Sequence, residues 1–246
     1  MQAYFLPFLS VILGYLVAVW IQPQNKRIIK LLLAFSGAFL LTMTVSHLLP
    51  EVYEHVLQSS AMHAQLSHHH HNHEHGHGGM KTIGLFIMLG IVFQIILEYF
   101  SKGAEHGHVH VNDKMTNLPW LLFISLCLHA LFEGLPISQH QHLALGIAVH
   151  HFPISMILTL FFIQGGLNRN IVLLFMILFA LMTPLGTLIS NSIPFLINYY
   201  AEISAFVIGI LFHISSTIIF ESSEGHKFNS AKLLSILLGV LIGFLM

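Results

Sequence analysis

One apolar stretch, residues 118–138, carries two ionisable side chains whose types and spacing suit metal binding. His129 and Glu133 are four residues apart, so on a helix both project from one face, about one turn from each other. An imidazole and a carboxylate placed in this way can bind one divalent cation together. The alternative is a buried hydrogen bond between them with a packing role. Ionisable groups are costly inside a membrane, so we expect a functional role.

A second pair, His150 and His151, lies in the next apolar stretch at a matching depth. If the first stretch enters the membrane at Leu118, then His129 lies about 17 Å and Glu133 about 22 Å above that face. The histidine pair lies roughly 18 to 20 Å above the same face, so we expect the two pairs to meet. By this count, the other ionisable residues are His47 near the outer face, Glu98 near the inner face and His213 near the middle.

The whole composition favours transition-metal chemistry without thiolate ligands. The chain has 20 His, more than its 9 Lys and Arg or its 10 Asp and Glu, and neutral imidazole is the commonest metal ligand. Its one cysteine, Cys127, excludes a disulfide framework and a cysteine-based zinc site. Imidazole and carboxylate suit Zn²⁺ and also accept Fe²⁺, Mn²⁺, Co²⁺ or Cd²⁺, while affinity order does not exclude Cu²⁺ or Ni²⁺.

The elements that carry these residues are predicted to be helices that span a lipid bilayer. Of the 246 residues, 55% are hydrophobic and 8% charged, and the mean hydropathy is +0.79. Soluble domains carry about 25% charged residues, so a soluble protein is excluded. The net charge of -1 excludes a nucleic-acid binder that relies on basic contacts. Apolar runs of roughly 20 residues predict an all-α polytopic bundle of eight transmembrane helices. These are residues 4–21, 31–49, 82–100, 118–138, 143–163, 171–190, 204–220 and 231–246.

Lys and Arg are concentrated in alternate loops between these spans. Loops 1-2, 3-4, 5-6 and 7-8, numbered by the spans they join, hold eight of the nine basic residues, and Lys81 is the ninth. Short loops rich in Lys and Arg stay in the cytoplasm. The pattern therefore predicts that both termini are extracytoplasmic, and it supports an even number of spans.

Two histidine-rich segments do not fit a membrane. Residues 67–79, SHHHHNHEHGHGG, fall in the outer loop between the second and third spans, and residues 103–114 form a smaller cytoplasmic loop. Neither offers a core to fold around, so we expect both to be mobile without metal. Composition favours metal scavenging by the first segment, and an inert spacer or a tag remnant is the alternative. The rest of residues 1–246 is predicted to form a single transmembrane domain.

Prolines beside the ionisable residues predict irregular helices around the expected site. Pro136 follows Glu133 within one turn, Pro153 follows His151, and Pro184 lies inside a third span. A proline inside a helix removes a backbone hydrogen bond and kinks the helix. Broken helices near the midplane are typical of transporter binding sites. The alternative is that prolines are frequent in membrane helices generally.

Four short motifs resemble the ZIP (Zrt/Irt-like) family of metal transporters. They are HALFEG at residues 129–134, HHFPI at 150–154, HLLPE at 47–51 and PLG at 184–186. The resemblance covers the whole chain, including the eight spans, the outer termini and the histidine-bearing loop 3-4. It implies a primary metal site on His129, Glu133 and His150.

The motifs depart from the family pattern at positions where the family, or some of its members, places ligands of a second, adjoining metal site. These positions are Ala130, His151, Ile154 and Thr183. We therefore expect one intramembrane ion instead of two. His151 is about 100° around a regular helix from His150, so it joins the same metal only if the Pro153 kink turns it inward, and otherwise it serves a neighbouring position. His213 is either an accessory ligand or a buried, hydrogen-bonded histidine.

The resemblance implies a secondary-type transporter that moves zinc into the cytoplasm, without enzyme activity or an organic cofactor. The outer tract, His47 and Glu51 would collect metal, and the central site would hold it. The ion would then pass to Glu98, Glu221 or the histidines of loop 3-4.

Two other functions are compatible with a buried metal site. The first is an intramembrane zinc-dependent hydrolase, which is disfavoured because HExxH is absent and Glu133 is the one carboxylate near the expected site. The second is a metal sensor without transport. Gly239 and Gly243 allow close helix packing, either within the chain or in a homodimer. Short loops indicate a bacterial inner (plasma) membrane.

Overall fold

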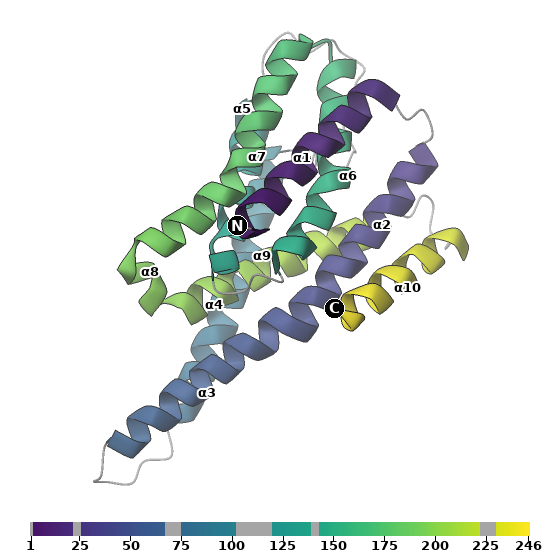
Figure 1. The fold of residues 1–246 in the computed structure, drawn as a ribbon. Helices are drawn as coiled ribbons and strands as arrows, with labels where there is room; N and C mark the ends of the chain where they lie inside the picture. Colours follow the sequence, from purple (N-terminus) through teal and green to yellow (C-terminus); the bar gives the residue numbers. More distant parts are fainter. Residues whose placement is uncertain (1, 22–25, 67–74, 102–119, 139–142, 222–229) are drawn as a thin grey trace.

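The computed structural model describes residues 2–21, 26–66, 75–101, 120–138, 143–221 and 230–246 (Figure 1). All regular structure in these segments is helical, which confirms the predicted all-α class. The elements are α1 (Gln2–Ile21), α2 (Lys26–Met43), η1 (Thr44–Leu48), α3 (Leu49–Leu66), α4 (His75–Ser101), α5 (Trp120–Gly134), η3 (Pro136–Ser138), α6 (Leu143–Gln164), α7 (Arg169–Ser192), α8 (Pro194–Asn198), α9 (Tyr200–Glu221) and α10 (Ser230–Leu245).

Seven helical segments among the described residues are long and apolar enough to cross a membrane. They are Tyr4–Ile21, Arg27–Ser59, Gly79–Phe100, Trp120–Ser138, Leu143–Gln164, Arg169–Ser192 and Tyr200–Phe220. The apolar helix α10 has 16 residues and is shorter than these. The helices support a polytopic membrane protein, whereas the eighth span and the outer position of both termini stay predictions.

The second predicted span is part of a longer helical segment. The sequence predicts an end at Leu49, but α2, η1 and α3 follow one another without a break from Lys26 to Leu66. Pro50 has no N–H, and its ring crowds the carbonyls of the preceding turn. The π-helical turn η1 lies directly before it, and the Leu49 N–H bonds the carbonyl oxygen of Thr44. The helix therefore widens at this point instead of stopping.

The end of α5 also differs from the sequence prediction. The helix ends at Gly134, whereas the sequence predicts a kinked helix that continues past Pro136. A proline disfavours helical dihedrals in the residue directly before it. Accordingly, the Leu135 N–H bonds the carbonyl three residues earlier in a tight turn, and the short 3₁₀ turn η3 follows. Pro153 and Pro184 do lie inside α6 and α7, as predicted.

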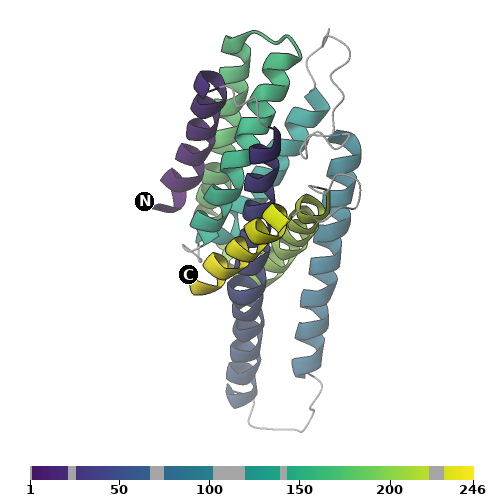
Figure 2. The same cartoon turned by 90° about the vertical axis from the view of Figure 1, so that its right-hand side faces the viewer.

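The two helices that carry the expected site belong to one set of packed helices. α5 packs on α7, α6 packs on α1, and α1 also packs on α7. A second set of helices forms the close pairs α4 with α9 and α2 with α10, and α2 also packs on α9. Contacts of α2 with α6 and of α4 with α5 join the two sets. In Figure 2, α3 and the beginning of α4 extend below the rest of the molecule.

The C-terminal helix α10 packs on α2 through two glycines. A Cβ at Gly239 would lie 2.5 Å from the carbonyl oxygen of Phe35, and one at Gly243 would lie 3.0 Å from Thr42 Cβ. Gly239 and Gly243 therefore serve close packing between two helices of the same chain. A homodimer stays a prediction that these glycines do not support.

Helices α4 and α9 touch backbone to backbone where two glycines cross. A Cβ at Gly90 would lie 1.9 Å from the carbonyl oxygen of Phe206, and one at Gly209 would lie 2.0 Å from that of Ile87. Neither position has room for a side chain unless the two helices separate.

Gly90→Ala should therefore lower the free energy of unfolding by about 1–3 kcal/mol, the usual cost of overfilling a packed interior. Gly84 is the matched control, since it lies on the same helix and a Cβ there would meet nothing within 4 Å. Gly84→Ala should be neutral or stabilise by up to about 1 kcal/mol, because alanine is the better helix former. Thermal unfolding of the purified variants measures both changes. Equal midpoints would contradict the close crossing of α4 and α9.

Candidate metal centre

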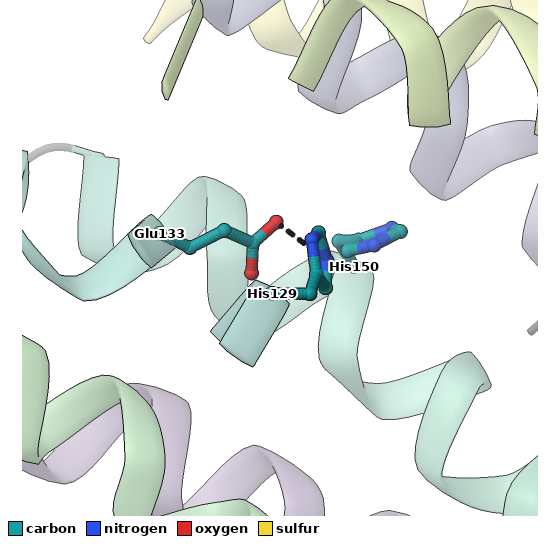
Figure 3. A group of neighbouring side chains, drawn as sticks. All are labelled: His129, Glu133 and His150. Atoms are coloured by element: carbon teal, nitrogen blue, oxygen red, sulfur yellow. Dashed lines mark ion pairs between the residues drawn. The ribbon is translucent and has the colours of Figure 1, made fainter. Parts of the chain in front are cut away.

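Three metal-ligating side chains from two helices converge inside the protein (Figure 3). His129 and Glu133 come from α5 and His150 comes from α6, and one ligand atom of each lies within 4.8 Å of the others. The three residues are buried, with exposed fractions of 4%, 0% and 1%. Among the described residues, this is the one group of three or more His, Cys, Asp or Glu side chains that could hold a metal ion in this way.

Helical spacing places His129 over Glu133, and α6 supplies the third group. His129 Nε2 lies 3.1 Å from Glu133 Oε1 across one turn of α5. The ring of His150 meets that of His129 edge-on, with centroids 6.5 Å apart. The structure thus brings together three of the residues that the sequence places at one depth.

The end of α5 is held against α7 by two glycines and a threonine. A Cβ at Gly134 would lie 2.2 Å from the carbonyl oxygen of Thr183, and one at Gly186 would lie 2.1 Å from a carbonyl oxygen of α5. Thr187 Oγ1 donates a hydrogen bond of 2.9 Å to the carbonyl oxygen of Gly134. These contacts position the turn of α5 that carries Glu133.

His151 faces the second oxygen of the same carboxylate. Its Nε2 lies 2.9 Å from Glu133 Oε2, and its ring centroid lies 5.4 Å from that of Phe179 on α7. The residue is buried, but it does not belong to the group of three that surrounds a common point. Whether His151 joins the same metal or serves a neighbouring position therefore stays a prediction.

The group offers a divalent cation two imidazoles and one carboxylate in the buried interior. An isolated buried carboxylate is costly, and Glu133 has one imidazole against each of its oxygens. Ligand atoms around a tetrahedral zinc ion, with bonds of about 2.0–2.1 Å, lie about 3.4 Å apart. Small side-chain rotations would therefore close this group on an ion. Three protein ligands would leave a fourth position for water or for an exchanging ligand.

His213 lies away from this group and contacts Glu98. The Nε2 of His213 on α9 is 2.6 Å from the Oε2 of Glu98 on α4, and both side chains are partly buried. The residue count expects Glu98 near the inner face and His213 near the middle, and it does not predict this contact. Helix α9 begins at Tyr200, four residues before the predicted start of that span.

The remaining predicted residues lie outside this group or outside the described part of the chain. His47 lies in the π-helical turn η1 and is partly buried, and Glu51 is exposed on α3. Glu221 is the last residue of α9, and its side chain lies outside the described part of the structure. The last five residues of the histidine tract at 67–79 form the beginning of α4. The rest of this tract and the loop at 103–114 lie outside the described residues.

Comparisons with known proteins confirm the resemblance to the ZIP family. Over 89 residues, the chain is 30% identical to zinc transporter SLC39A7 of Mus musculus, covering 36% of this chain and 18% of that protein. Over 105 residues, it is 32% identical to zinc transporter ZIP1 of Danio rerio, covering 35% of each. It is also 32% identical over 89 residues to SLC39A7 of Sus scrofa.

No protein-family model matches the chain. The matched regions span about a third of this chain and at most about a third of these relatives' own length. Together with the seven long apolar helices, the matches support an integral membrane protein that is similar to zinc transporters.

Proposed function

We propose that this protein transports divalent metal ions, with zinc as its main substrate, across the membrane into the cytoplasm. The observation that carries the proposal is the buried group of His129, Glu133 and His150, which comes from two helices long and apolar enough to span a membrane. Ionisable groups at such positions typically mark ion pathways. The relatives that match about a third of the chain are named zinc transporters, which supports the same substrate.

The ligand set accepts several ions. Two imidazoles and a carboxylate without a thiolate suit Zn²⁺. The same donors bind Fe²⁺, Mn²⁺ and Cd²⁺, so we propose these as competing substrates. The metal is cargo in this account, and no organic cofactor takes part.

The proposed path runs from the outer histidine tract to the cytoplasmic loop 3-4. His47 and Glu51 receive metal on the outer side, and the central group holds it without most of its water. Glu98 and Glu221 then lead it toward the histidines of residues 103–114, with His213 beside Glu98. The direction rests on the eight-to-one distribution of basic residues between alternate loops, which puts both termini outside. Short loops favour a bacterial inner membrane as the location.

The histidine tract should affect uptake chiefly when external metal is scarce. It has seven histidines within residues 67–79, which should bind several ions weakly and raise the local metal concentration. Because α4 begins at His75, the histidines should be replaced by serine and not deleted. We expect a higher half-saturation concentration for zinc uptake and a similar maximal rate. A lower maximal rate with an unchanged half-saturation would indicate a gating or structural role instead.

Zinc flux into sealed vesicles tests the proposed function directly. Purified protein is reconstituted, and a zinc-sensitive dye inside the vesicles reports uptake. Saturable flux that empty vesicles lack is expected of a transporter. A hydrolase or a metal sensor would bind zinc without carrying it, so tight binding without flux would contradict the proposal.

A further inference from the structure

Two consecutive histidines of α6 face different partners. His150 lies beside His129 and belongs to the group that could hold a metal ion, whereas His151 contacts Glu133 Oε2. Consecutive residues of a helix point about 100° apart, so one helix can present one imidazole to His129 and the next to Glu133.

The surroundings of His151 hold its ring in one place. The residue is 1% exposed, and its ring lies against that of Phe179, which is itself buried. Its Nε2 is 2.9 Å from Glu133 Oε2. Its Nδ1 has no hydrogen-bond partner among the described residues, so Glu133 provides the polar contact that orients the ring.

The direction of this hydrogen bond follows from the charge of the acceptor. A carboxylate must be deprotonated to bind a metal ion, and a deprotonated carboxylate only accepts hydrogen bonds. The Nε2 of His151 must therefore carry the proton and donate it to Oε2. A protonated ring nitrogen has no lone pair for a metal, so the atom nearest to Glu133 cannot be a metal ligand while this bond exists.

We propose that His151 is a positioning residue for the metal site and not one of its ligands; this inference rests on the proposed function. By donating to Oε2, it holds the carboxylate of Glu133 so that Oε1 faces His129, whose Nε2 is 3.1 Å away. Hydrogen bonds of this kind orient metal-binding carboxylates, and their loss typically lowers metal affinity about 10- to 100-fold.

The test compares zinc uptake by reconstituted full-length chains that carry single substitutions. His151→Gln keeps an N–H donor at about the position of Nε2 and should retain near wild-type uptake. His151→Ala removes the donor, and His151→Asn keeps a polar amide that is too short to reach Glu133. Both should raise the half-saturation concentration about 10- to 100-fold. His150→Ala removes one of the three donor groups and should lose saturable uptake.

Rescue by glutamine distinguishes positioning from coordination and from a general packing role. If His151→Gln is as inactive as His150→Ala, His151 is a ligand and the proposal is wrong. A wild-type half-saturation concentration in both His151→Ala and His151→Asn also overturns the proposal. If the alanine variant does not fold, the result for His151→Asn alone decides. A wild-type chain without flux, or His150→Ala with wild-type flux, contradicts the proposed function itself.

Discussion

Replacing His129 or Glu133 by alanine is expected to abolish saturable metal uptake, with a loss greater than the roughly 100-fold that a supporting residue produces. Each substitution removes one of three buried donor groups, and no His, Cys, Asp or Glu in the described part of the chain extends that group. Glu133→Ala should have the larger effect, because it removes the negative charge and leaves His129 and His151 without the carboxylate that each of them contacts. Initial rates of zinc uptake over a range of concentrations measure the loss.

The control variants should remove the same two types of side chain, a glutamate and a histidine, at exposed positions. Glu54 and His55 are exposed on α3 and have no assigned role in the site. Glu54→Ala and His55→Ala should keep wild-type uptake at matched expression. If Glu133→Ala and His129→Ala behave like these controls, the two residues do not belong to the transport mechanism.

The transmembrane core is expected to hold one tightly bound metal ion, and none after Glu133→Ala. Ala130 and Ile154 stand where the resembled family has further ligands, and both are buried apolar side chains. Thr183 occupies a third such position and is buried as well. These side chains provide no charge for a second cation beside the first.

Metal counting requires a chain in which the histidines of both tracts are replaced, because the tracts would add weakly bound ions. Elemental analysis after dialysis should then give one zinc ion per chain. Two equivalent tight ions would contradict the expected stoichiometry, and His151 would be the first residue to examine for additional ligation. That outcome would also count against its role as a positioning residue.

The apolar runs of the sequence predicted the helices well, but not all of their ends. Burial in lipid requires long stretches without charge, so the existence of each span is visible in composition alone. The continuation of α2 into α3 is not visible, since a proline ordinarily argues for an end. The π-helical turn at residues 44–48 that precedes Pro50 depends on local packing.

The candidate site could be predicted in part for a similar reason. The spacing of His129 and Glu133 follows from helix periodicity, and a residue count brought His150 to the same depth. The rotation of each helix about its own axis is set by packing, for example by Gly134 and Gly186 between α5 and α7. The sequence therefore left the orientation of His151 undecided.

The contact between Glu98 and His213 lay beyond sequence reasoning as well. These residues are 115 positions apart and share no spacing pattern. Their pairing depends on how closely the glycine crossing of α9 with α4 brings the two helices together.

Anomalous diffraction at the zinc absorption edge, from crystals of the full-length protein grown with zinc, tests the central claim most directly. The account predicts a strong peak between α5 and α6, about 2.0–2.2 Å from one atom each of His129, Glu133 and His150. No peak should lie within bonding distance of His151. Zinc peaks confined to surface histidines, with none within reach of Glu133 at saturating zinc, would contradict it.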